Sequence, residues 1–125
     1  MGKGLFISIS NSSTVPITID YDNIKYVHEN GKQGSNFAKI TGILQPGHSF
    51  DVQYIEASAH VYNPASFRMN LHGDFDPLSL DFKEKDGWSV IPNKVIGGQM
   101  QMQASATVVP GNQDRINVKI HRNVS

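Results

Sequence analysis

A two-residue alternation of apolar and polar side chains is the feature that most constrains the fold of this chain. It is clearest in residues 99–109, QMQMQASATVV, where every second side chain is apolar. Successive side chains of a β-strand point to opposite faces of a sheet, so this pattern predicts one long, half-buried strand. Residues 115–121 alternate in the same way after the turn PGNQD. The two segments are therefore predicted to form a hairpin.

The same alternation predicts strands along the rest of the chain. Further strands are expected at residues 5–9, 17–21, 38–44, 50–54, 67–71, 78–84 and 88–91. In the strand at 50–54, Phe50, Val52 and Tyr54 are expected to share one face. The stretch NIKYVHENGKQGSNF fits either a strand that ends in an Asn30-Gly31 turn or a long irregular loop.

No window of eleven or more residues has a helical period, and turn-forming residues recur every ten residues or so. Strands with one apolar face bury that face when two sheets pack together. We therefore predict an all-β fold, an antiparallel β-sandwich of about 8 to 10 strands, with a β-barrel or jelly roll as the alternative. The length of 125 residues predicts one domain spanning residues 1–125.

Charge and cysteine content exclude several classes of function. Eleven Lys and Arg residues balance eleven Asp and Glu residues, so no nucleic-acid partner is expected. The absence of cysteine rules out disulfides, thiolate zinc sites and a cysteine nucleophile. The N-terminal MGKGLFISIS lacks the features of a signal peptide, and no apolar run is long enough for a transmembrane segment. We expect a soluble protein that is cytoplasmic, or secreted by a leaderless route.

One segment concentrates groups with catalytic or metal-binding chemistry, namely HGDFDPLSLDFKEKDGW, with five carboxylates, a histidine and the only tryptophan. The alternation places Asp81 on the wet face beside Arg68 if the two strands pair, and it leaves Asp74 and Asp76 in a turn. Cross-strand pairing and turn chemistry thus explain the acidic residues.

The sequence contains no recognisable motif for catalysis or metal binding. Asp74-x-Asp76 continues as Pro77-Leu78 instead of an EF-hand loop, and the five histidines share no ligand spacing. No G-x-S-x-G, G-x-G-x-x-G or Walker pattern occurs. Asp81 and Asp86 as a glycosidase pair lack any sign of a cleft. We expect no catalytic residue, no metal site and no cofactor.

Loops that carry aromatic and polar side chains favour recognition, because binding residues usually lie on the connections of a rigid scaffold. The candidate ligand-binding residues are His60, Tyr62 and Asn63 in loop 57–66, and Asp86 and Trp88 in loop 84–88. Tyr26 lies in a third such loop, 26–37. An exposed aromatic ring can stack on a sugar or contact a choline headgroup. The alternative is that Trp88 and Tyr62 are core residues at strand ends.

A resemblance to a known group adds to this interpretation. The first strand runs into NSSTVPITI, a Pro-Gly turn precedes SFDVQYI, and FRMNLHGDFDPLSLDFKEKDGWSV and a terminal INVKI follow. In order and size these elements resemble the small sandwiches of the aegerolysins, actinoporins and fungal fruit-body lectins. The resemblance implies binding of glycans or lipid headgroups without enzymatic chemistry, with the strand at Trp88 and the loop around Tyr62 as the matching positions.

Two departures limit what the resemblance implies. Actinoporins have an amphipathic N-terminal helix, whereas Lys3-Gly4 leads here directly into a strand. Their membrane-facing loops are rich in Trp and Tyr, whereas this chain has one Trp and four Tyr. Pore formation by this chain alone is therefore not expected.

The predicted function is that of a non-enzymatic domain, lectin-like or similar to a membrane-binding toxin, which recognises a glycan or lipid headgroup through loops at one end of the sandwich. A peripheral membrane contact is compatible with this function, and we expect a homo-oligomer because multivalency strengthens weak sites. The alternative is a structural or protein-interaction domain that pairs through exposed strand edges. A third hypothesis is a hydrolase that uses Asp81, Asp86 or a histidine.

Overall fold

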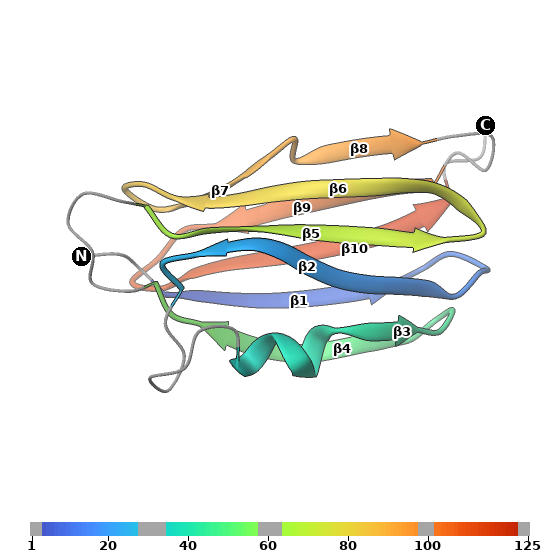
Figure 1. Cartoon of the computed structure of the whole chain (residues 1–125), viewed down its shortest axis with the longest axis horizontal. Helices are drawn as coiled ribbons and strands as arrows, with labels where there is room; N and C mark the ends of the chain where they lie inside the picture. The colour runs from blue at the N-terminus through green and yellow to red at the C-terminus, as the bar shows by residue number, and fades with distance from the viewer. Residues whose placement is uncertain (1–3, 28–34, 58–63, 98–101, 123–125) are drawn as a thin grey trace.

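Ten β-strands in two five-stranded sheets, packed face to face, make up the part of the chain that the computed structural model describes (Figure 1). The described residues are 4–27, 35–57, 64–97 and 102–122. The strands are β1 (Leu5–Asn11), β2 (Ile17–Lys25), β3 (Gly42–Leu44), β4 (Ser49–Ile55), β5 (Ser66–Gly73), β6 (Phe75–Glu84), β7 (Trp88–Ile91), β8 (Lys94–Gly97), β9 (Met102–Val109) and β10 (Asp114–Arg122). The predicted all-β sandwich is confirmed, and within the described ranges it contains no α-helix.

The two sheets differ in strand order and in the direction of one pair of strands. Sheet A has the order β4-β1-β10-β9-β8, and sheet B has the order β3-β2-β5-β6-β7. Every pairing is antiparallel except that of β1 with β10, which run parallel from Leu5 opposite Asp114 to Asn11 opposite Ile120. The parallel pair is a departure from the purely antiparallel sandwich predicted from the sequence.

The core lies between the sheets and consists of the apolar side chains that alternate along each strand. In β9 and β10 the buried residues are Met102, Ala104, Ala106, Ile116, Val118 and Ile120. This set confirms the faces predicted for the terminal hairpin, whose strands pair in antiparallel register. An aromatic cluster fills one part of the core: Phe67 stacks on Phe82 with ring centroids 4.6 Å apart, and Phe37 and Trp88 pack against Phe67.

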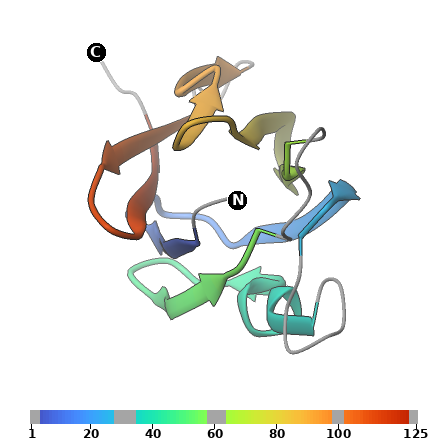
Figure 2. The same ribbon diagram turned by 90° about the vertical axis from the view of Figure 1, so that its left-hand side faces the viewer.

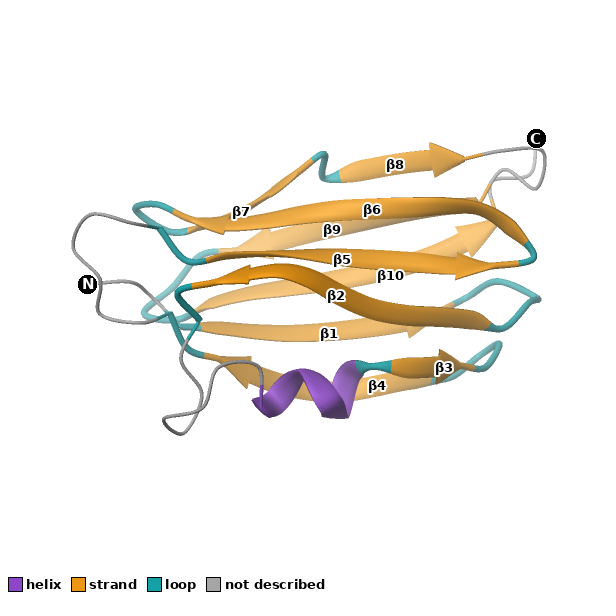
Figure 3. Ribbon diagram, in the orientation of Figure 1, coloured by secondary structure: helices purple, strands orange, loops and turns teal. Residues whose placement is uncertain are grey.

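Two predicted elements differ from the structure. In β4 a register shift opposite Ile7 and Ile9 inserts a bulge, which leaves Val52 50% exposed and places Tyr54 outward opposite Phe6. Since one extra residue reverses the phase of a strand, Val52 and Tyr54 do not share the inner face with Phe50. The strand expected at 38–44 is a 3-10 helix, η1 (Ser35–Ile40), followed by the short β3 (Figure 3).

The side chain of Asn11 ties two turns together at the end of the sandwich where β1 ends. Its Nδ2 donates hydrogen bonds to the carbonyls of Val15 and Leu44, each at 2.9 Å. Its Oδ1 accepts from the backbone N–H and the hydroxyl of Ser13, at 2.9 and 2.6 Å. Asn11 is only 1% exposed, so every polar atom of this buried amide is satisfied by protein groups.

Candidate functional site

The residues predicted to bind a ligand divide into three cases. His60, Tyr62 and Asn63 lie outside the described residues. Asp86 is exposed in the turn between β6 and β7. Trp88 is 4% exposed and packs against Phe67, with ring centroids 5.7 Å apart. Of the two predictions for Trp88, an exposed ring or a core residue at a strand end, the structure agrees with the second, because the alternation of β7 points this side chain inward.

The described flanks of the connections predicted to carry the site lie at one end of the sandwich, which we call the loop end (residues 25–27, 56–57, 64–66, 84–88 and 110–114). Val27 after β2 forms a bridge with Ala57 after β4. The carbonyl of Ala65 accepts a 2.8 Å hydrogen bond from the N–H of Glu84. Figure 2 looks onto this end of both sheets. The flanks of loops 26–37, 57–66 and 84–88 are therefore neighbours in space.

The buried carboxylate of Asp114 holds the loop end together. Its Oδ2 accepts a 2.7 Å hydrogen bond from the backbone N–H of Trp88, and its Oδ1 accepts one from Gly111 at 3.3 Å. The carboxylate of Glu84 accepts a 2.9 Å hydrogen bond from the N–H of Gly87. The hydrogen bonds from the N–H groups of Gly87 and Trp88 fix the turn that presents Asp86 to solvent.

Among the described residues, Tyr26 is an exposed aromatic side chain at the loop end. It is 36% exposed, and its backbone has a φ of 56°. A positive φ is costly for a bulky residue and persists only where the surrounding structure enforces it. Asp86, at the same end, has a φ of 57°. Two of the three non-glycine residues with positive φ in the described ranges thus lie at the loop end, and such outliers concentrate at functional sites.

A row of polar side chains crosses the outer face of sheet B next to Tyr26. Lys25 pairs with Ser66, and Ser66 pairs with Lys83 on its other side. Both lysines are exposed, and no described carboxylate lies within ion-pair distance of either. Neighbouring strands lie about 4.8 Å apart, so the two lysine backbones are roughly 10 Å apart with the serine between them. The row offers ammonium and hydroxyl groups to an anionic or hydroxyl-rich ligand.

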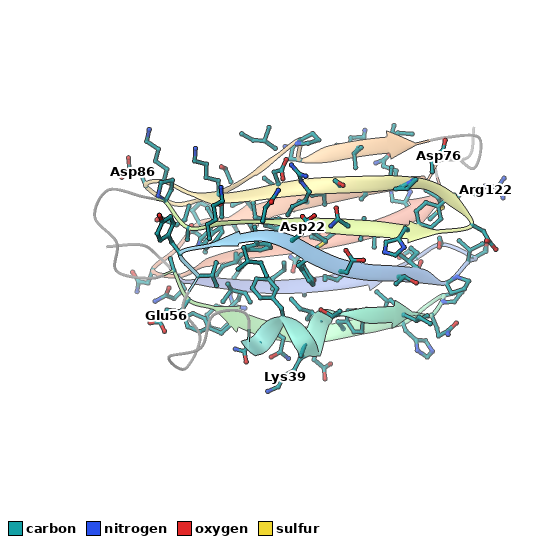
Figure 4. The ribbon with its side chains drawn as sticks, in the orientation of Figure 1. Asp22, Lys39, Glu56, Asp76, Asp86 and Arg122 are labelled. Atoms are coloured by element: carbon teal, nitrogen blue, oxygen red, sulfur yellow. The ribbon has the colours of Figure 1, made fainter. Side chains whose placement is uncertain are left out.

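Of the acidic residues around β6, Asp81 forms the cross-strand pair that the alternation predicts, whereas Asp76 lies within β6 and not in the predicted turn. Arg68 pairs with Asp81, and its Nε donates a 2.8 Å hydrogen bond to Oδ1 of that carboxylate. Asp22, labelled in Figure 4, lies on the same face opposite Arg68. Among the described residues, no three Asp, Glu or His side chains converge as they would around a metal ion.

A second polar cluster on this face centres on Asp20. Its Oδ2 lies 2.6 Å from Nε2 of His72, and its Oδ1 accepts a 3.1 Å hydrogen bond from Nδ2 of Asn70. Oδ1 of Asn70 in turn accepts a 2.9 Å hydrogen bond from the Ser79 hydroxyl. The hydrogen bond with His72 is the main cause that lowers the pKa of Asp20 below its usual value of 3.8.

This pairing predicts an acid-dependent contribution to stability. A carboxyl group whose pKa is lowered by folding stabilises the protein above its unfolded pKa, and this contribution disappears as the pH falls through the folded pKa. Because both side chains are half exposed, the contribution should be at most about 1 kcal/mol. Asp20→Asn should therefore reduce the loss of unfolding free energy below about pH 4, measured by urea titration at several pH values. The same substitution at the exposed Asp76 is the matched control, and an equal effect there would contradict the assignment.

Comparison with known proteins adds no family to this description. No model of a protein family matches the chain, and no curated protein is similar to it. Within the described ranges, no helix has the length and apolar character needed to cross a membrane.

Proposed function

We propose that this protein is a non-enzymatic binding domain that recognises a glycan or a lipid headgroup at the loop end of its sandwich. The observation that carries the proposal is the exposed, conformationally strained Tyr26 beside the Lys25–Ser66–Lys83 row. The tyrosine ring can stack on a sugar or contact a quaternary ammonium group. The adjacent ammonium and hydroxyl groups can bind sugar hydroxyls or a headgroup phosphate.

The geometry of the sheet edges argues against the alternative of partner binding by strand pairing. Edge strands β3, β7 and β8 span only three, four and four residues. The longer edge strand β4 is interrupted by its bulge, and the amide of Asn36 caps the carbonyl of Tyr54 at 2.8 Å. Short, bulged or covered edges are the means by which β-proteins avoid edge-to-edge pairing. These features support loop recognition over edge pairing.

The environment of the acidic residues also supports a binding function over hydrolysis. A general acid in a glycosidase needs a carboxyl group in a desolvated site that raises its pKa. Asp81 lies on an open sheet face and is engaged by Arg68, whereas Asp86 is exposed in a turn. Neither carboxylate has the surroundings that such a reaction requires.

Replacement of Tyr26 by Asn is expected to weaken ligand binding about 5- to 30-fold, because the ring contributes roughly 1 to 2 kcal/mol of stacking or cation–π energy. Asn tolerates a positive φ, so the backbone and the melting temperature should be preserved. Binding is measured on an array of neutral glycans and by sedimentation with phosphatidylcholine vesicles.

The control is Ile43→Asn, which places the same side chain at an exposed position on β3. This control should bind as the parent protein does. The proposal fails if the parent protein binds none of these probes, or if both variants weaken binding equally.

A further inference from the structure

The outer face of sheet A carries basic side chains that no described carboxylate neutralises. Arg115 and Lys119 point outward from β10, and Lys94 points outward from β8. All three are exposed, and neither of the ion pairs between described residues involves them. Because these charges remain unpaired, the face has an excess of positive charge although the whole chain is neutral.

The strand register fixes how these charges are spaced. Arg115 and Lys119 are four residues apart on one strand, which corresponds to roughly 13 Å. Lys119 and Lys94 both pair with Ser105, so they lie two strands, or roughly 10 Å, apart. The three cations therefore mark out a broad, open triangle and not a pocket for one small anion.

Arg115 is held in place by aromatic stacking. Its guanidinium carbon lies 4.9 Å from the centre of the Phe6 ring, and the Phe6 ring packs against Tyr54 with centroids 5.0 Å apart. Tyr54 in turn lies over Gly4, where an added Cβ would be 2.1 Å from the tyrosine hydroxyl. Stacking leaves the N–H groups at the edge of a guanidinium available for a bidentate anion. Arg115 is thus preorganised as a donor.

Short polar side chains cover the surface between the cations. Those between the cations are Ser105, Thr107 and Asn117 on β9 and β10, and Ser8 and Ser10 extend the polar surface onto β1, on the other side of β10. The Ser8 hydroxyl donates a hydrogen bond to Oδ1 of Asn117. A flat surface of hydroxyl and amide groups matches a ligand that is itself rich in hydroxyl groups.

The outer face of sheet B differs in charge from that of sheet A. The outer face of sheet B carries Asp20, Asp22 and Asp81 on β2 and β6. On sheet A, the exposed acid among the described residues of these strands is Asp51, at the bulge of the edge strand β4. On sheet B the basic side chains Lys25, Arg68 and Lys83 balance the three acids, so that face has no excess of either charge. An extended anion therefore meets an excess of positive charge on the outer face of sheet A.

We propose that the outer face of sheet A binds a linear, anionic polysaccharide, with sulfate or carboxylate groups at Arg115, Lys119 and Lys94 and sugar hydroxyls over the polar surface between them. Single-stranded nucleic acid needs exposed aromatic rings for base stacking, whereas Arg115 covers Phe6. A bilayer favours a contiguous group of protruding aromatic and apolar side chains, whereas the exposed Ile96 and Val109 of this face lie apart, with serine and threonine side chains of β9 between them. This inference does not depend on the function proposed for the loop end.

Heparin is the probe for the first test, because it is a linear sulfated polysaccharide. Affinity is measured by calorimetric titration between about 50 and 500 mM salt. With three ion contacts, the logarithm of the affinity should fall against the logarithm of the salt concentration with a slope of roughly 2 to 3. Lys94→Gln/Lys119→Gln should lower that slope by about 2 and reduce low-salt affinity at least tenfold.

The matched control is Lys39→Gln/Lys85→Gln, which makes the same change in net charge away from this face. This control should keep the parent affinity and slope, as should Tyr26→Asn at the loop end. Arg115→Lys keeps the charge but loses the stacked guanidinium, and it should weaken binding severalfold.

Three results would overturn the proposal. The first is that heparin does not bind, and the second is that both double-lysine variants lose affinity equally. The third is that single-stranded DNA or phosphatidylserine vesicles bind as tightly as heparin, with the same dependence on Lys94 and Lys119. Loss of neutral-glycan or phosphatidylcholine binding in Tyr26→Asn bears only on the loop end, so the two proposals fail separately.

Discussion

Asn11→Asp is expected to lower the free energy of unfolding by about 3 to 5 kcal/mol at neutral pH. The substitution preserves the size of the side chain but replaces two N–H donors by an acceptor. The carbonyls of Val15 and Leu44 would then lose their hydrogen bonds and face a buried negative charge. A protein of this size is stable by only about 5 to 15 kcal/mol, so the substitution should remove a large fraction of the total stability.

The matched control for this prediction is Asn117→Asp on the exposed face of β10. There the side chain accepts a hydrogen bond from Ser8, and a carboxylate oxygen can accept it equally well. This control should change the unfolding free energy by less than about 0.5 kcal/mol in a urea titration. A similar loss at both positions would show that the turn at Asn11 does not depend on its amide donors.

Phe67→Ala is expected to lower the free energy of unfolding by about 3 to 5 kcal/mol, because it removes the centre of the aromatic cluster. Phe67 is 2% exposed, and its ring contacts those of Phe37, Phe82 and Trp88. Rings from β2, β6, β7 and η1 surround it, so the cavity cannot close by movement of a single loop. The loss in unfolding free energy should therefore include both the lost burial of the ring and the cost of the cavity that it leaves.

The fluorescence of Trp88, the only tryptophan, measures this effect directly. Its burial predicts emission at short wavelength and weak quenching by acrylamide in the parent protein. Phe67→Leu, which keeps most of the volume, should cost less than about 1.5 kcal/mol and leave the emission nearly unchanged. Strong quenching of Trp88 in the parent protein, or equal costs for both variants, would contradict the described cluster.

Alternation along the chain predicted much of the fold because the direction of a side chain in a regular strand is a local property. Residues 116–120 follow this rule in their burial, and so do residues 102–108, except that Gln103, predicted on the wet face, is only 8% exposed. The bulge in β4 does not, since the extra residue near Val52 has no local signature. Residues 38–40 are part of the strand predicted at 38–44, yet Tyr21 donates a 2.8 Å hydrogen bond to the carbonyl of Ile40 and helps hold them in η1.

The candidate sites were less accessible to sequence reasoning because they depend on contacts between distant residues. Trp88 is buried because it packs on Phe67 of another strand, a partnership that composition does not reveal. The positive φ of Tyr26 is a property of the folded backbone and has no sequence signal. Arg115 meets Phe6 only because β1 and β10 pair in parallel, whereas the sequence predicted antiparallel neighbours.

The parallel pairing of β1 with β10 also bears on the order of events during synthesis. Residue 5 lies opposite residue 114, so the middle of sheet A stays open until residues 114–122 have left the ribosome. Until then β1 exposes one row of backbone donors and acceptors, which another nascent chain can pair with. Closing so long a loop is slow. The pairing of β1 with β10 should therefore limit the rate at which this molecule assembles.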